Sequence, residues 1–113
     1  MTVDLHGIIP ALVTPFDADG EINERLFRDH VRFILNKNVH GVCLAGSTGE
    51  GFTFSPAELR QLTAATVEEV NGKVPVVAGI IANSTREVIE RANAVKDLGV
   101  AALQVTPTYY VFN

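Results

Sequence analysis

Four short runs of apolar residues recur along the chain at intervals of roughly 25–35 residues. Each run has the length of a strand and shows little alternation of apolar and polar positions, which is typical of parallel strands buried on both faces. The predicted strands are residues 8–13, 42–45, 74–81 and 101–105. The pattern therefore predicts a parallel sheet of four buried strands.

Each interval between these runs has apolar residues three and four positions apart, as on one face of an amphipathic helix. The three faces comprise Phe27, His30, Val31 and Ile34, then Leu59, Leu62, Thr63, Thr66, Val67 and Val70, then Val88, Ala92 and Val95. Residues 55–58 and 84–87 both read Ser-x-x-Glu, the signature of a capping box at a helix start. Leu98-Gly99 predicts the end of the third helix, with the glycine in the left-handed conformation.

The resulting order is β-α-β-α-β-α-β, as expected for parallel strands joined by helical crossovers. Two architectures fit this order: a flavodoxin-like open sheet and half of an eightfold barrel. The chain shows no linker, low-complexity segment or second domain, so we expect residues 1–113 to form a single unit.

Composition narrows the possible partners. The chain has 47% apolar and 19% charged residues, ordinary values for a soluble protein, and a net charge of −4. An acidic balance argues against nucleic acid and anionic membranes as partners. The amino end lacks a secretory pattern, and no apolar run reaches the ~18 residues of a membrane span. We therefore expect a cytoplasmic protein. The sequence contains no residues with the spacing of metal ligands and no cofactor-binding motif, so we expect no cofactor.

The loop after the second predicted strand is the most informative polar segment. It reads Gly46-Ser47-Thr48-Gly49-Glu50-Gly51 and lies where parallel sheets place their ligand sites. Its glycines allow a ligand to approach the backbone closely, and the hydroxyls of Ser47 and Thr48 stand beside free N–H groups. These donors suit a carboxylate or a phosphate. The alternative is an ordinary turn that precedes a helix.

Other candidate residues carry weaker signals. Tyr109 and Tyr110 offer either a phenolic proton relay or an aromatic pair that packs at an interface. Glu50 is a candidate base or a residue whose hydrogen bonds fix the loop. Cys43 lies within a strand and is interpreted as a small core residue. The three histidines lie on an apolar helix face or at the opposite end of the sheet.

Three motifs, Gly-Ile-Ile-Pro-Ala-Leu-Val-Thr-Pro-Phe at 7–16, Gly-Ser-Thr-Gly-Glu at 46–50 and Val-Thr-Pro-Thr-Tyr-Tyr at 105–110, occur in one order along the chain. Together they resemble the dihydrodipicolinate synthase / N-acetylneuraminate lyase family, and the resemblance covers essentially the whole chain. It implies a (β/α)₈ TIM barrel. The chain would be its amino-terminal half, a single partial domain over 1–113 with four strands and three complete helices.

The resemblance also implies a chemistry, that of a class I aldolase-type lyase or synthase. In such an enzyme a lysine forms a Schiff base with the keto group of pyruvate or another 2-oxo acid. Ser47 and Thr48 would bind the carboxylate of that acid, and Ser47 would join a proton relay. Tyr109 would extend the relay into the site of a neighbouring subunit, so a homo-oligomer, a dimer or a tetramer, is implied.

Two residues of the family pattern are not found in this chain. The Schiff-base lysine and the main catalytic tyrosine lie on later strands, and Lys37, Lys73 and Lys96 belong to helix ends or to the opposite face of the sheet. We therefore expect this chain to be a fragment that is inactive by itself. Thr108 and Val111 also depart from the family pattern, which leaves the second substrate open.

A further expectation concerns the edges of the predicted sheet. The strands at 8–13 and 101–105 would leave open apolar edges, so the isolated chain is expected to dimerise or aggregate.

The alternative function is a flavodoxin-like module that binds a phosphate or a cofactor at 46–51.

Overall fold

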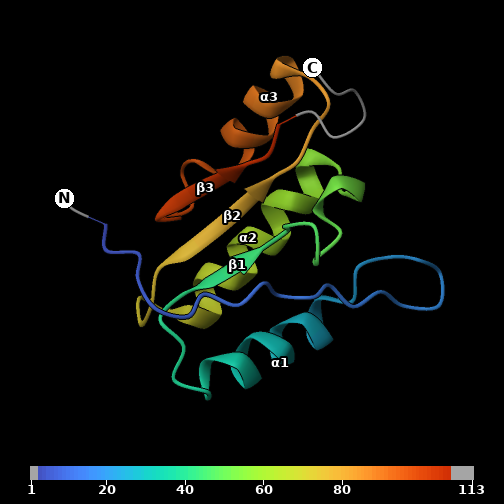
Figure 1. The fold of residues 1–113 in the computed structure, drawn as a ribbon. Coiled ribbons are helices and arrows are strands. Elements are labelled where there is room, and N and C mark those ends of the chain that lie inside the picture. The colour runs from blue at the N-terminus through green and yellow to red at the C-terminus, as the bar shows by residue number, and fades with distance from the viewer. Residues whose placement is uncertain (1–2, 108–113) are drawn as a thin grey trace.

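Helices and strands alternate along the computed structural model, which describes residues 3–107 (Figure 1). The helices are α1 (Glu24–Leu35), α2 (Pro56–Val70) and α3 (Thr85–Val95), with a 3-10 turn η1 (Gly51–Thr53) before α2. The strands are β1 (Val42–Leu44), β2 (Val76–Ile80) and β3 (Ala102–Val105). They form one parallel sheet in the order β1-β2-β3, as the alternation of elements predicts.

The first predicted strand, residues 8–13, runs beside β1 without forming a regular strand. It makes one parallel bridge, from Ala11 to Cys43, in which the Leu12 N–H donates to Cys43 O at 2.8 Å. The Cys43 N–H in turn donates to Pro10 O at 3.0 Å. Proline has no N–H, so the next donor that a regular ladder needs is missing. The prediction of four strands is therefore wrong by one in the described part of the chain.

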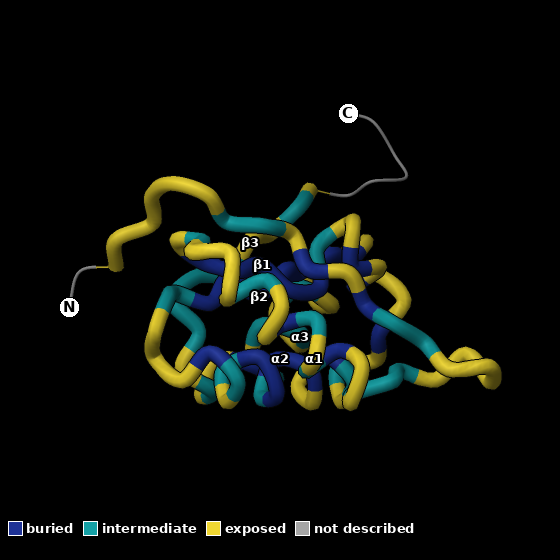
Figure 2. The backbone as a smooth tube through the Cα atoms, turned by 90° about the horizontal axis from the view of Figure 1, so that it is seen from below, coloured by how far each residue is buried: buried dark blue, intermediate teal, exposed yellow. Residues whose placement is uncertain are grey.

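All three helices pack on the same face of the sheet (Figure 2). The core lies between them and includes Leu12, Phe27, Leu44, Leu59, Leu62, Ala78, Ile80 and Val95. A flavodoxin-like sheet carries helices on both faces, whereas a barrel wall carries them only outside. The arrangement is thus that of a segment of a barrel wall.

The other face of the sheet is open, because no helix within residues 3–107 packs on it, yet every residue of β1 and β2 is buried, as predicted. Among the three strands only β3 departs from the prediction: its residues are half-buried or exposed, and Val105 is 53% exposed. The predicted burial is therefore wrong for β3, which lies at an edge of the sheet.

The helix ends show which of the capping motifs predicted from the sequence form in the structure. At α2 the predicted capping box is complete: Ser55 Oγ accepts the Glu58 N–H at 3.1 Å, and Glu58 Oε1 accepts the Ser55 N–H at 2.8 Å. At α3 Ser84 caps Glu87, but the Glu87 carboxylate accepts the Asn83 N–H instead. This helix ends at Val95, earlier than predicted, and turns follow as far as Gly99, whose φ is +88° as expected for a left-handed glycine.

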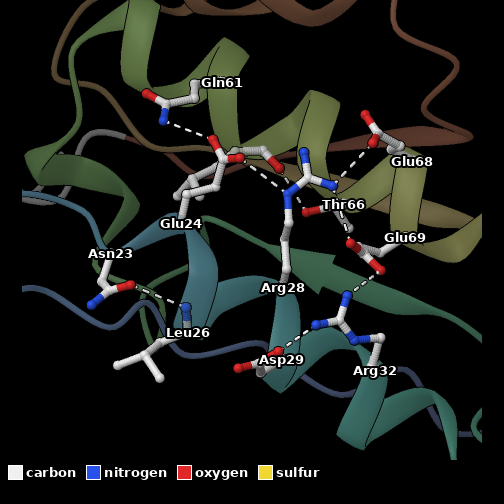
Figure 3. Close-up of polar contacts among 11 residues, drawn as sticks. Asn23, Glu24, Leu26, Arg28, Asp29, Arg32, Gln61, Thr66, Glu68 and Glu69 are labelled. Carbon is white, nitrogen blue, oxygen red and sulfur yellow. Dashed lines mark hydrogen bonds and ion pairs between the residues drawn. The ribbon is translucent and has the colours of Figure 1, made fainter.

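An ion-pair network joins the outer faces of α1 and α2 (Figure 3). Arg28 contacts Glu24, Glu68 and Glu69 at 3.0–3.2 Å, and Arg32 contacts Glu69 at 2.9 Å. The hydrogen bond from Gln61 and then that from Arg28 lower the pKa of Glu24. The network joins the two helices side by side along their surfaces.

Two histidines hold the ends of the segment 8–13. The Ile8 N–H donates to His40 Nδ1 at 3.0 Å, and the Val13 N–H donates to His30 Nε2 at 3.2 Å. Each accepting nitrogen must be unprotonated. Burial lowers the pKa of His30 from its ordinary value of 6.5, so the folded state favours the neutral ring. The histidines that sequence patterns left without a role thus attach this segment to the rest of the fold.

This attachment makes the stability of the fold depend on pH. Because the folded chain binds the proton of His30 less readily than the unfolded chain, the stability is complete above the unfolded pKa and falls as the pH drops through the folded pKa. Between about pH 7.5 and 5.5 we expect a loss of about 1 kcal/mol, the net value of one hydrogen bond. Urea unfolding across this range measures it. His30→Gln should flatten the dependence and His6→Gln should not; an unchanged slope in His30→Gln would refute this role.

Candidate functional site

The loop that follows β1 closes on itself. The Glu50 N–H donates to Ser47 O, and the Gly51 N–H donates to Gly46 O, both at 3.1 Å. Gly51 is buried, whereas Ser47 and Thr48 are exposed. The two hydroxyl residues thus lie at the exposed tip of a closed turn, at the carboxyl end of the strands where the sequence pattern predicted a ligand site.

Three consecutive N–H groups at this tip are unoccupied. Within the described residues no acceptor is found for the N–H groups of Ser47, Thr48 and Gly49, nor for the hydroxyls of Ser47 and Thr48. Of the three residues Ser47 and Thr48 are exposed and Gly49 is buried, and adjacent main-chain donors of this kind form a concavity that favours an anion. The loop therefore carries the free N–H groups that the sequence predicts, and that they bind an anion stays a prediction.

The backbone at the start of the loop is left-handed, at a residue that is not glycine. Ala45 has φ +57° and is buried. This conformation turns its carbonyl against two glycines. A Cβ on Gly51 would lie 1.9 Å from Ala45 O, and a Cβ on Gly79 of β2 would lie 2.3 Å from the same atom. Both positions need glycine because main chain packs against main chain there.

The glycines of the loop therefore serve different purposes. Sequence reasoning assigned Gly46, Gly49 and Gly51 to the close approach of a ligand. A Cβ on Gly49 would lie 2.8 Å from Leu12 O, so this glycine also serves packing. Only Gly46 is uncrowded, because the nearest atom to its Cβ would be Gln104 Oε1 at 3.9 Å.

Thr14 holds the loop from the side of the amino-terminal segment. Its Oγ1 donates to Gly49 O at 2.7 Å, in a buried hydrogen bond. The hydroxyl therefore ties the segment that precedes α1 to the loop that follows β1. Sequence patterns place Thr14 after the first strand but do not reveal its partner, which lies 35 residues away.

The side chain of Glu50 does not fix the loop through hydrogen bonds within the described residues, and its role as a base stays a prediction. Its carboxylate is exposed and forms no hydrogen bond within residues 3–107. Its main chain stabilises the turn instead, because Glu50 O accepts the N–H of Thr53 at 3.0 Å and the Thr53 hydroxyl at 2.8 Å. The left-handed φ of +58° at Glu50 allows this turn.

Below the loop, the open face of the sheet forms a hollow of about 410 Å³, lined by Leu5, Ile9, Ala11, Cys43, Val77, Ala102, Leu103 and Gln104. Cys43 Sγ lies 3.3 Å from Gln104 Oε1, and burial raises the pKa of this thiol. A protonated thiol is a poor nucleophile, in agreement with the interpretation of Cys43 as a core residue.

At the end of β3 the buried Thr106 Oγ1 has no hydrogen-bond partner in the part of the chain that is described.

Several predicted residues lie elsewhere. Tyr109 and Tyr110, with Thr108 and Val111, lie outside the described residues 3–107. Lys73 and Lys96 are exposed at the amino end of β2 and after α3, away from the loop. Lys37 Nζ lies 4.6 Å from the centre of the exposed Phe33 ring.

Among residues 3–107 no three His, Cys, Asp or Glu side chains are close enough together to hold a metal ion. No helix in the same residues is long and apolar enough to cross a membrane.

Comparison with known proteins connects this geometry to a family. The sequence model of the Dihydrodipicolinate synthetase family matches residues 4–113. The 4-hydroxy-tetrahydrodipicolinate synthase of Methanopyrus kandleri is 47% identical over 111 residues, which are 97% of this chain and 37% of the relative. The chain thus spans little more than a third of the length of that curated relative.

Solved structures with similar folds lead to the same family. The N-acetylneuraminate lyase of Fusobacterium nucleatum matches with a TM-score of 0.84 and 34% identity over 95% of this chain and 38% of its own. YagE, a prophage protein of E. coli K12 from the dihydrodipicolinic acid synthase family, was solved in complex with pyruvate. It matches with a TM-score of 0.85 and 27% identity over 95% of this chain and 36% of its own.

The predicted resemblance and the predicted α/β class are both confirmed by these matches, and the fold corresponds to part of a TIM barrel. The chain belongs to the dihydrodipicolinate synthetase family.

Proposed function

We propose that this chain is the amino-terminal portion of a class I aldolase-type lyase or synthase, and that its loop 46–50 binds the carboxylate of pyruvate or another 2-oxo acid. The observation that carries this proposal is the set of three unoccupied N–H groups at Ser47, Thr48 and Gly49 beside two unpaired hydroxyls. A family member solved with pyruvate supports the choice of ligand.

The donors suit a carboxylate better than a phosphate. A carboxylate offers two oxygens, which three N–H groups and two hydroxyls can satisfy. A phosphate dianion usually draws on a helix N-terminus or a lysine as well. Here α2 begins only at Pro56, and none of the three lysines lies at the loop. Because the helices cover one face only, the flavodoxin-like alternative is not favoured.

Two side chains receive roles in the chemistry of the intact enzyme. Ser47 would exchange a proton with the reacting substrate, because its hydroxyl has no other partner among the described residues. Tyr109 would extend this relay into the site of a neighbouring subunit, so we propose that the intact enzyme is a homo-oligomer. A cytoplasmic location and the absence of nucleic-acid and membrane partners remain part of the proposal, supported by the net charge of −4.

The covalent step requires an amine at the carboxyl ends of the strands. Lys37, Lys73 and Lys96, the three lysines of the chain, all lie elsewhere and are exposed. We propose that the Schiff-base lysine and the main catalytic tyrosine belong to a part of the enzyme beyond these 113 residues, so that this chain alone is inactive.

Reductive trapping of a Schiff base tests whether this chain lacks a reactive lysine. We expect that pyruvate and borohydride leave the mass of the chain unchanged under conditions in which an intact relative, such as the Methanopyrus kandleri synthase, gains a reduced pyruvate adduct. Chemical acetylation of surface amines serves as the control for their accessibility. A stoichiometric pyruvate adduct on any of the three lysines would show that the chain carries its own reactive amine.

A further inference from the structure

Arg91 of α3 contacts the turn that follows the candidate loop. Its Nη2 donates to Phe54 O, and its Nη1 lies 3.5 Å from Gly51 O. The side chain is half-buried, on a helix whose sequence gives no sign of such a contact. The guanidinium thus holds two carbonyl groups of η1 and its C-cap at once, as the forked arrangement of its donors permits.

The partners of Arg91 differ from those of three other arginines on the helices. Arg28, Arg32 and Arg60 each pair with carboxylates. Arg91 forms no ion pair within residues 3–107, and both of its contacts are main-chain carbonyls. Its charge is therefore not neutralised by a neighbouring carboxylate. In a chain with a net charge of −4, this is a local positive charge beside the loop.

Gly51 transmits the contact to the loop. Its N–H closes the loop by donating to Gly46 O at 3.1 Å, while its carbonyl accepts from Arg91. On the opposite side, Thr14 holds Gly49 O. The free N–H groups therefore lie on a turn attached at two points, to the amino-terminal segment through Thr14 and to α3 through Arg91.

We propose that Arg91 is a positioning residue for the loop 46–50: it orients the unoccupied N–H groups through Gly51 and so sets the affinity for the bound anion. The part of this inference that concerns the anion rests on the proposed function. The part that concerns the loop does not, because it follows from the hydrogen bonds of the unliganded chain.

Amide hydrogen exchange of this chain, followed by NMR, directly measures how well the N–H groups of the loop are protected. In Arg91→Met we expect the amides of Glu50 and Gly51 to exchange about tenfold faster, because a hydrogen bond from a charged donor is lost. The amide of Ala78 in β2 should keep its rate. Arg60→Met is the matched control, since Arg60 also binds a main-chain carbonyl, Ala94 O at 2.9 Å, but not at the loop. It should leave both loop amides unchanged.

Arg91→Lys keeps the charge and one donor, so its loop amides should exchange at an intermediate rate. If Arg91→Met does not fold, Arg91→Lys decides: wild-type exchange at Glu50 and Gly51 would overturn the proposal. It is equally overturned if Arg91→Met accelerates Ala78 as much as the loop, because the residue would then serve general stability.

Titration with pyruvate adds the second readout. Arg91→Met should weaken binding by about five- to tenfold, and Arg60→Met should not change it. Unchanged binding in Arg91→Met overturns the link to affinity. If the wild-type chain does not bind pyruvate at all, the proposed function fails, and the exchange rates still decide the positioning role.

Discussion

Replacing Gly51 by alanine is expected to destabilise the fold by about 3 kcal/mol or more. The added Cβ would lie 1.9 Å from Ala45 O, and the obstructing atom belongs to a buried main chain that cannot rotate away. Relief requires the loop to move, which also breaks the hydrogen bond from the Gly51 N–H to Gly46 O. Urea unfolding followed by circular dichroism measures the loss.

Gly46→Ala is the matched control in the same loop. Its Cβ would have nothing closer than Gln104 Oε1 at 3.9 Å, so we expect a change of less than about 1 kcal/mol. Equal losses in the two variants would contradict the packing of Ala45 against Gly51. A loss confined to Gly51→Ala would show that this glycine serves the fold and that Gly46 is not needed for packing.

Phe27→Ala is expected to cost about 3–5 kcal/mol, the range found when a buried aromatic ring is removed from a core. Phe27 is 0% exposed on the inner face of α1 and is among the largest fully buried side chains. Its removal leaves a cavity between this helix and the sheet. The midpoint of urea unfolding and its slope measure the effect.

Phe33→Ala, on the same helix, controls for the loss of a phenylalanine as such. Phe33 is 57% exposed and lies beneath Lys37 Nζ. We expect a change of about 0.5–1 kcal/mol, from the cation–π contact. Similar losses in the two variants would mean that α1 does not pack through the face that contains Phe27.

The elements whose signals are local could be predicted well from the sequence. The capping box at Ser55 and the apolar stripe of α2 both lie within one helix, and both are confirmed in the structure. For α3 the helical face is right but its end is wrong, because Gly99 marks the end of the turns that follow and not that of the helix.

The errors in the sheet have a common cause. The prediction for residues 8–13 rested on the apolar run, and the N–H that Pro10 lacks interrupts the ladder there. The burial predicted for β3 assumed cover on both faces, and the structure covers one. Apolarity shows that a strand will be buried by something, but not by which element.

The structure of the candidate loop could be predicted in part. Its glycines, hydroxyls and free N–H groups could be found from residue types and from their place after a strand. The left-handed backbone of Ala45 could not, because alanine gives no sign of it. Nor could the contacts of Thr14 and Arg91, which join residues 35 and 40 positions apart. Such contacts depend on the packed fold, and no local pattern encodes them.

An NMR titration of this chain with pyruvate tests the central claim most directly, namely that the loop 46–50 binds the carboxylate of a 2-oxo acid. We expect saturable shifts of the amides of Ser47, Thr48 and Gly49, weaker in Ser47→Ala, with no shift at Gly72 in the exposed turn after α2. Unmoved loop amides, or amides that respond to inorganic phosphate and not to pyruvate, would contradict it.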